Sequence, residues 1–193
     1  MSTITKQNFE FLKALEKNNN RDWFNENKAT YEKCHNEVIA FADALLVEMK
    51  KHDNIETASG KRSLMRIYRD VRFSKDKSPY KTNWGGSFTR ATKLLRGGYY
   101  YHIQPGNCFL GGGFWGPNVD DLLRIRKDID ANPNELRKII NSKSFKETFG
   151  ELQGDQLKTA PKGFDKDHEA IDLLRYKQFL IGKSFTDKEV MAP

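Results

Sequence analysis

The sequence between Arg66 and Lys81, RIYRDVRFSKDKSPYK, concentrates side chains that suit the binding of an anion. Arginine offers planar, forked donors to phosphate or carboxylate oxygens, and lysine adds a mobile point charge. A solvated basic face, in which Arg69 and Asp70 pair only for structure, is the alternative interpretation. The bases that we expect to hold the anion are Arg66, Arg69, Arg72, Lys75, Lys77 and Lys81.

Aromatic, glycine and polar residues close to this stretch are predicted to line the same pocket. Glycines leave bare backbone that a ligand or a helix can approach closely. His102 is the best candidate for a general acid or base, because imidazole titrates near neutral pH, although a lone histidine is also common as a structural residue. The residues that we expect to line the pocket are Asp70, Tyr80, Tyr100, Gln104, Gly111 and Gly112.

Other motifs that carry chemistry are weak in this sequence. His35, His52 and His168 have no ligand-like spacing with one another or with the two cysteines, so no metal site is predicted. The run Gly111–Gly116 matches GxGxxG, but a dinucleotide site needs a parallel βαβ unit, and this run follows a predicted antiparallel hairpin. We therefore expect no cofactor. The sequence has no P-loop lysine motif, no GxSxG elbow and no HExxH.

The positive charge of the chain is concentrated in its centre. The 193 residues carry a formal charge of +7. Residues 61–104 hold eleven Lys or Arg against two Asp, a local charge of +9, whereas the remaining 22 bases and 24 acids sum to −2. Such a concentration attracts phosphates, carboxylates or nucleic acid.

Composition indicates a folded protein of the cytoplasm. Hydrophobic residues make up 37% of the chain and charged residues 31%, the proportions of a polar globular domain. No run of eighteen apolar residues exists and the N-terminus lacks the profile of a secretion signal, so we expect no membrane partner. Cys34 and Cys108 are expected to be reduced, buried thiols.

Hydrophobic periodicity predicts helices first and strands next. Apolar residues at helical spacing predict a helix over residues 6–17 and a second helical region over 22–52 that breaks near Asn27. Alternation predicts a strand over 64–73, with Met65, Ile67, Val71 and Phe73 toward the core; it places Arg69 on that side too, where the residue must find a carboxylate or the strand must bend. A further strand is expected over 84–91.

The clearest local signal is YYYHIQPGNCFLGGG, residues 99–113, in which a Pro-Gly turn separates two apolar runs. Pairing Gln104 with Asn107 puts one set of side chains in the core and leaves Tyr100, His102, Gln104 and Phe109 on the opposite face. The set expected in the core is Tyr99, Tyr101, Ile103, Cys108 and Leu110.

The C-terminal part is predicted to be mainly helical. Helices are expected after a cap at Asn118, over 132–141 and over 167–176, with a loop at 151–166 and a strand at 178–185. The order of elements predicts an α+β fold, a mostly antiparallel sheet with a central hairpin packed by N-terminal and C-terminal helices. We expect residues 1–193 to form one domain. Thr186 and Glu189 form a capping-box pattern so close to the end that we expect the domain to be truncated at its C-terminus.

Three motifs in order resemble one known family. The segments FEFLKALEKNNNRDWFNENKATYE, RDVRFSKDKSPYKT and YYYHIQPGNCFLGGGFW are similar to the largely bacterial and fungal family known as domain of unknown function 2461. The resemblance spans nearly the whole chain. It implies an α+β domain and no established activity, and it implies that the family usually continues beyond Pro193.

Three function classes fit these observations. The first is binding, or enzymatic processing, of a small phosphate- or carboxylate-bearing ligand, with His102 as proton carrier. The second is binding of single-stranded nucleic acid, in which the same bases contact the backbone while Tyr80, Trp84, Phe88 and Tyr100 stack on unpaired bases. The third is a non-catalytic domain that binds an acidic protein partner. We expect the small anion first, because arginines that converge in a concavity would select it.

Overall fold

A computed structural model describes residues 4–92 and 94–192. It divides into two compact units. The first contains the residues up to Leu110 together with those from Ser184 onward, and the second is Gly111–Lys183. The boundary falls within two strands of the sheet, β3 and β4.

The first unit begins with three helices, which confirm the predicted helical regions. They are α1 (Lys6–Lys17), α2 (Arg21–Glu26) and α3 (Lys28–Met49). Asn27 separates α2 from α3, at the predicted break. Asn20 caps α2 by accepting a hydrogen bond from the backbone N–H of Trp23 at 2.9 Å, so the polar run after α1 starts the next helix. A further short helix, α4 (Gly60–Ser63), lies just before the segment predicted to be a strand.

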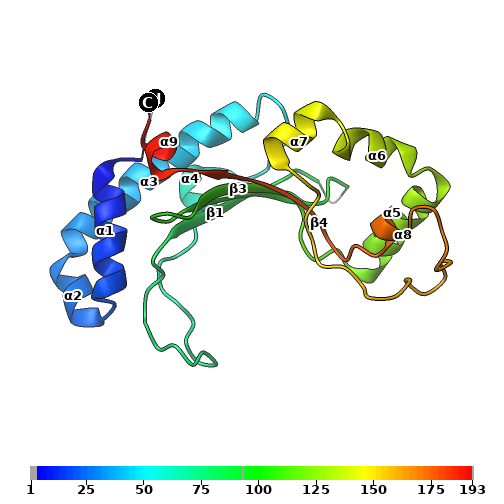
Figure 1. Cartoon of the computed structure of the whole chain (residues 1–193). Coiled ribbons are helices and arrows are strands. Elements are labelled where there is room, and N and C mark those ends of the chain that lie inside the picture. Colours follow the sequence, from blue (N-terminus) through cyan, green and yellow to red (C-terminus); the bar gives the residue numbers. More distant parts are fainter. Residues whose placement is uncertain (1–3, 93, 193) are drawn as a thin grey trace. The chain divides into compact units, whose positions relative to one another are not determined.

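Four antiparallel strands form one sheet in the order β1-β2-β3-β4, which confirms the α+β class (Figure 1). The strands are β1 (Trp84–Thr89), β2 (Gly98–Ile103), β3 (Cys108–Phe114) and β4 (Phe179–Phe185). β2 and β3 are the predicted central hairpin, whose turn is closed by a 2.9 Å hydrogen bond from the Asn107 N–H to the Gln104 carbonyl. In the register of β1 with β2, Gly85 faces His102 and Ser87 faces Tyr100.

The hairpin side chains alternate as predicted near the turn. Tyr101, Ile103 and Cys108 are buried in the core, and Tyr100 and His102 lie on the other face of the sheet. Leu110 was expected in the core but is 39% exposed. The predicted burial therefore holds next to the turn and fails at Leu110, where the first unit ends.

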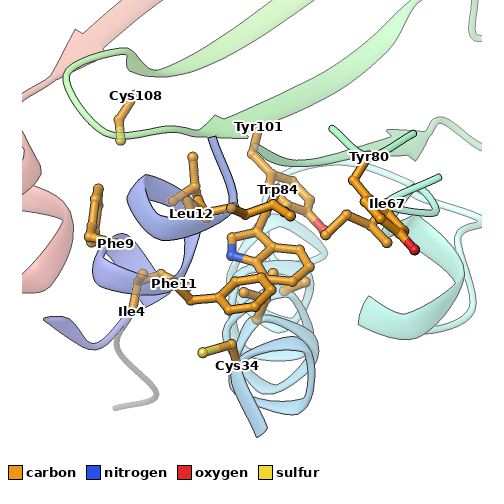
Figure 2. Close-up of a cluster of buried hydrophobic side chains, with 14 of the residues drawn as sticks. Ile4, Phe9, Phe11, Leu12, Cys34, Ile67, Tyr80, Trp84, Tyr101 and Cys108 are labelled. Carbon is orange, nitrogen blue, oxygen red and sulfur yellow. The ribbon is translucent and has the colours of Figure 1, made fainter. Parts of the chain in front are cut away.

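Trp84 lies at the centre of the main core (Figure 2). Its ring stacks on Phe11 of α1, with 6.1 Å between centroids. Tyr101 is also buried, and its hydroxyl lies 3.0 Å from the Ser63 hydroxyl. Burial raises the pKa of Tyr101 to about 12, so the hydroxyl stays protonated. Cys34 and Cys108 are free and buried, as expected.

The prediction of a strand over residues 64–73 is wrong. This segment makes only isolated antiparallel bridges, Leu64 to Gly86 and Tyr68 to Tyr80. The last backbone hydrogen bond between the two sides of this loop runs from the Arg69 N–H to the Pro79 carbonyl at 2.9 Å, and the ring nitrogen of Pro79 has no hydrogen to donate in return. We call residues 66–81 the basic arm.

The basic arm extends as a long, narrow loop away from α3 and α4 (Figure 1). Ile67, at its base, is buried as predicted. Phe73 was expected in the core and is 96% exposed, and Met65 is also exposed, because the segment has no continuous neighbouring strand to hold a core-facing side.

The second unit contains helices around a small core of its own. Its helices are α5 (Val119–Ala131), α6 (Asn134–Ile140), α7 (Lys143–Phe149) and α8 (Ile171–Leu174). The predicted cap at Asn118 is confirmed, since its side chain accepts from the Asp121 N–H at 2.8 Å. Helix α7 was not predicted, although the Ser142 cap and Gly150 at its end are standard signals. Helix α8 is shorter than the predicted 167–176.

The chain returns to the first unit with α9 (Asp187–Met191), which starts with the predicted capping box of Thr186 and Glu189. Val190 and Met191 of this helix pack against the main core. Among the described residues, no helix is long and apolar enough to cross a membrane.

Replacing Gly60 with alanine is expected to destabilise the first unit. The added methyl group would collide with the Ile39 carbonyl and lie 2.5 Å from the Asp43 nitrogen, both rigid backbone of α3. Overpacking of this kind costs about 1–3 kcal/mol of unfolding free energy, measurable by urea denaturation followed by circular dichroism. Gly111→Ala is the control, because its methyl group would meet nothing closer than 3.7 Å. Equal stability of both variants would contradict the prediction.

Candidate functional site

The basic arm is fastened to the core at Tyr80. The Asn19 side chain donates to the Tyr80 carbonyl at 2.9 Å and accepts from the Tyr80 N–H at 3.1 Å. The Phe24 ring stacks on the Tyr80 ring with 4.0 Å between centroids. Tyr80 is only 4% exposed, so it anchors the arm, and its ring is not available to a ligand.

Both expected solutions for Arg69 occur in the structure, a bend in the chain and a carboxylate partner. The chain bends after Arg69, and its guanidinium pairs with the Asp76 carboxylate and donates to the Ser78 carbonyl at 3.2 Å. Asp76 also accepts from the Ser78 N–H at 2.9 Å and the Ser78 hydroxyl at 2.6 Å. These hydrogen bonds from Ser78, followed by the one from Arg69, lower the pKa of Asp76 to about 2.

Two more cations of the arm have partners within it. Arg72 binds Asp70 through both ends of its guanidinium, with Nε at 2.9 Å and Nη2 at 2.6 Å. Asp70 therefore pairs with Arg72 and not with Arg69. Lys77 donates to the Val71 carbonyl at 3.0 Å. Half of the six predicted anion-binding residues are thus held by the arm itself.

The other three cations remain available to a ligand. Arg66 and Lys75 are exposed, and neither makes a hydrogen bond or ion pair within residues 4–92 and 94–192. Lys81 is half-buried at the base of the arm. Burial, and next the charge of Arg66, lower the pKa of Lys81. A cation is therefore disfavoured at this place, and a bound anion would relieve the repulsion.

Two aromatic rings of the arm face solvent. Tyr68 is 52% exposed, and Phe73 is almost fully exposed at the far end. The Arg72 guanidinium lies 5.9 Å from the Phe73 ring centroid. These rings were not among the predicted site residues. Trp84, Phe88 and Tyr80, which were expected to stack on bases, are buried instead because they face the helices.

A second cluster lies on the face of the sheet opposite the core. The Tyr100 hydroxyl lies 3.0 Å from Nδ1 of His102, and Nε2 of His102 lies 2.9 Å from Oε1 of Gln104. The Phe109 ring stacks on the His102 ring, with 4.8 Å between centroids and an interplanar angle of 14°. The structure thus brings together three predicted residues and adds Phe109. We call Tyr100, His102 and Phe109 the sheet platform.

Asn83 connects the platform to the arm. Its amide nitrogen lies 3.4 Å from Nδ1 of His102, and it follows Lys81 by two positions. Because an amide nitrogen only donates, Nδ1 is the acceptor and Nε2 carries the hydrogen toward Gln104. Both ring nitrogens of His102 are therefore engaged by neighbouring side chains. Its role as a proton carrier stays a prediction.

Gly111 and Gly112 lie within β3, in the second unit. A side chain at Gly111 would meet only the Ile181 carbonyl, at 3.7 Å. The GxGxxG run therefore begins inside a strand of an antiparallel sheet and does not form the strand-to-helix turn that holds a dinucleotide. Gly113 is required by the backbone, since its φ is +129° and a side chain would collide with the Phe179 carbonyl.

An open depression of about 530 Å³ lies at the C-terminal end of α3, lined by residues 50–55. Its carboxylate, Asp53, is already bound by the Arg90 guanidinium and by the Tyr99 hydroxyl, each at 2.6 Å. The hydrogen bond from Arg90, and next that from Tyr99, lower the pKa of Asp53 to about 2. This group fastens the segment after α3 to the sheet. In the described residues, no group of His, Cys, Asp or Glu is arranged to hold a metal ion.

These features define an α+β protein with a projecting basic arm and an aromatic, polar cluster on the face of its sheet opposite the main core. Residues 7–193 match the family described as conserved hypothetical protein, DUF2461. The chain therefore belongs to this family, which confirms the resemblance of its motifs. Searches of curated proteins and of solved structures found no match.

Replacing Asn19 with alanine is expected to loosen the arm. The change leaves the buried Tyr80 N–H and carbonyl without partners and should lower the unfolding free energy by about 2 kcal/mol. Hydrogen exchange of the Arg69 and Lys81 amides, which bond across the base of the arm, should accelerate more than that of α1. Asn18→Ala is the control, because Asn18 bonds only within α1 on the exposed side. The same exchange rates in both variants would disprove the anchoring role.

The carboxyl group of Asp76 is expected to titrate near pH 2, measured by carbon NMR of the side chain. Ser78→Ala should raise this pKa toward the ordinary value near 4, because Ser78 supplies the largest effect. Ser74→Ala, in the same arm, should leave it unchanged. A lowered folded-state pKa stabilises the arm above the unfolded value, and the effect is lost as pH falls through the folded value. The order of the arm should therefore decline between about pH 4 and pH 2; a titration near pH 4 in the native protein would contradict this.

Proposed function

We propose that the protein binds nucleic acid, with the phosphates held by the basic arm. The observation that carries the proposal is that Arg66 and Lys75 make no hydrogen bond or ion pair in the part of the chain that the structure describes, and that Lys81 is half-buried at the base of the same arm. They lie along an extended, exposed segment, and a chain of phosphates can follow such a segment with one contact per cation. The electropositive surroundings of Lys81 add to the attraction.

The small anion expected from the sequence is less well supported. A small ligand needs several donors that converge on it, and Arg69, Arg72 and Lys77 each bind a group of the arm itself. Of the cations that remain, Arg66 and Lys81 lie together at the base of the arm, and Lys75 lies farther along it. An extended polyanion fits this distribution better than a single phosphate or carboxylate does.

A cytoplasmic location fits the same proposal. Nucleic acid is abundant there, and the two free thiols, Cys34 and Cys108, suit a reducing compartment. Binding needs no cofactor. A catalytic role for His102 would require a reaction in addition to binding, and binding alone accounts for the arm.

The double variant Arg66→Ala, Lys75→Ala is expected to weaken binding of a fluorescein-labelled twelve-nucleotide single strand, measured by anisotropy between 50 and 200 mM salt. About 0.7 of a counterion is released per phosphate contact on a single strand, so three contacts give a salt slope of about −2 and the double variant a slope of about −0.7. The loss of affinity should be similar for different base sequences.

The matched control is Lys13→Ala, Lys17→Ala, which removes the same charge from the exposed side of α1. If the control weakens binding as much as the arm variant does, net charge alone is responsible and the arm has no special role. Absence of binding by the native protein at 50 mM salt would overturn the proposal. A thermal shift with phosphorylated metabolites or organic acids in that case would support the small anion.

A further inference from the structure

The sheet platform has the composition of a binding surface for a flat ring. Tyr100 and His102 come from β2 and Phe109 from β3, and the rings of Tyr100 and Phe109 lie 5.7 Å apart. Opposite them, β1 presents only Gly85 and Ser87. A side chain at position 85 would lie 2.6 Å from the Tyr100 hydroxyl, so it would displace this hydroxyl from its place beside His102.

The polar groups around the platform keep unused hydrogen-bonding capacity. Asn83 uses its amide nitrogen on His102, and Gln104 uses its carbonyl oxygen. Within the described part of the chain, Oδ1 of Asn83 and Nε2 of Gln104 make no hydrogen bond to a protein group. One acceptor and one donor therefore flank the rings. The edges of nucleobases carry both kinds of group and their faces stack on aromatic rings.

We infer that Tyr100, His102 and Phe109 bind an unpaired nucleobase, with Asn83 and Gln104 placed to hydrogen-bond its edge. This inference rests on the proposed function and specifies its ligand as single-stranded nucleic acid. Charge complementarity supports this occupant, because Asn83 contacts His102 and is only two residues from Lys81, a cation at the base of the arm. Bases inside a duplex present no face to the platform, so a duplex is bound through the arm alone.

The inference is tested with two labelled probes of the same length and charge, a twelve-nucleotide single strand and its abasic counterpart, measured by anisotropy at 100 mM salt. The native protein should bind the strand with bases at least about fivefold more tightly, which is the lower limit for one stacked base. Phe109→Leu and His102→Leu should remove most of this difference and leave the affinity for the abasic strand unchanged. Trp115→Ala removes an exposed aromatic ring elsewhere, 77% exposed, and should keep the difference.

The outcomes separate this inference from the proposed function. Equal affinity of the native protein for both probes overturns the platform and leaves binding by the arm in place. Binding of neither probe overturns both. A difference that survives in the Phe109 and His102 variants places the base elsewhere and also overturns the inference.

A second measurement uses only the native protein and tests the inference even if those variants fail to fold. The native protein is irradiated with a strand carrying 5-bromouracil, and the cross-linked peptide is identified by mass spectrometry. A cross-link within residues 98–109 supports the platform. Cross-links confined to Tyr68 and Phe73 of the arm would show that the bases stack there, against the inference.

Discussion

The arrangement of the candidate site depends on one pair of hydrogen bonds, between the side chain of Asn19 and the backbone of Tyr80. An asparagine amide offers a donor and an acceptor in the geometry of a neighbouring strand, so it completes the bonding of a residue that has only an isolated bridge beside it. With Tyr80 fastened and stacked on Phe24, the chain on either side is oriented. The arm leaves the core on one side of Tyr80, and Asn83 reaches His102 on the other.

Ion pairs between side chains of the arm itself hold the arm in its shape. Asp70 and Asp76 engage Arg72 and Arg69, and these are exposed pairs of the kind that contribute little to overall stability. Their effect is local, because each fixes a bend in a segment without regular secondary structure. The cations left over lie near the base and the middle of the arm. The number of basic residues in a sequence segment is therefore larger than the number of cations that a ligand can contact.

The elements that the sequence predicts correctly are those decided by neighbouring residues. The break at Asn27, the Pro-Gly hairpin and the caps at Asn118 and Thr186 depend on contacts within a few positions. The strand over residues 64–73 failed because alternation describes an extended chain equally well with or without a partner strand. Asn19 and Asn83 were missed because their partners lie 61 and 19 positions away, and no local pattern announces such contacts. His102, Tyr100 and Gln104 were grouped correctly because strand alternation next to a tight turn is reliable.

Ile67 and Tyr80 are both buried, and the residues between them on the arm touch little of the core. The ends of this segment are therefore held by the core, whereas its middle is held by contacts within the arm itself. The entropy of closing a loop changes only with the logarithm of the loop length. Insertions, deletions and charge substitutions in the middle of the arm should therefore change the free energy of unfolding little. The shape and charge of the arm can therefore be changed without disturbing the helices and the sheet to which its ends are fixed.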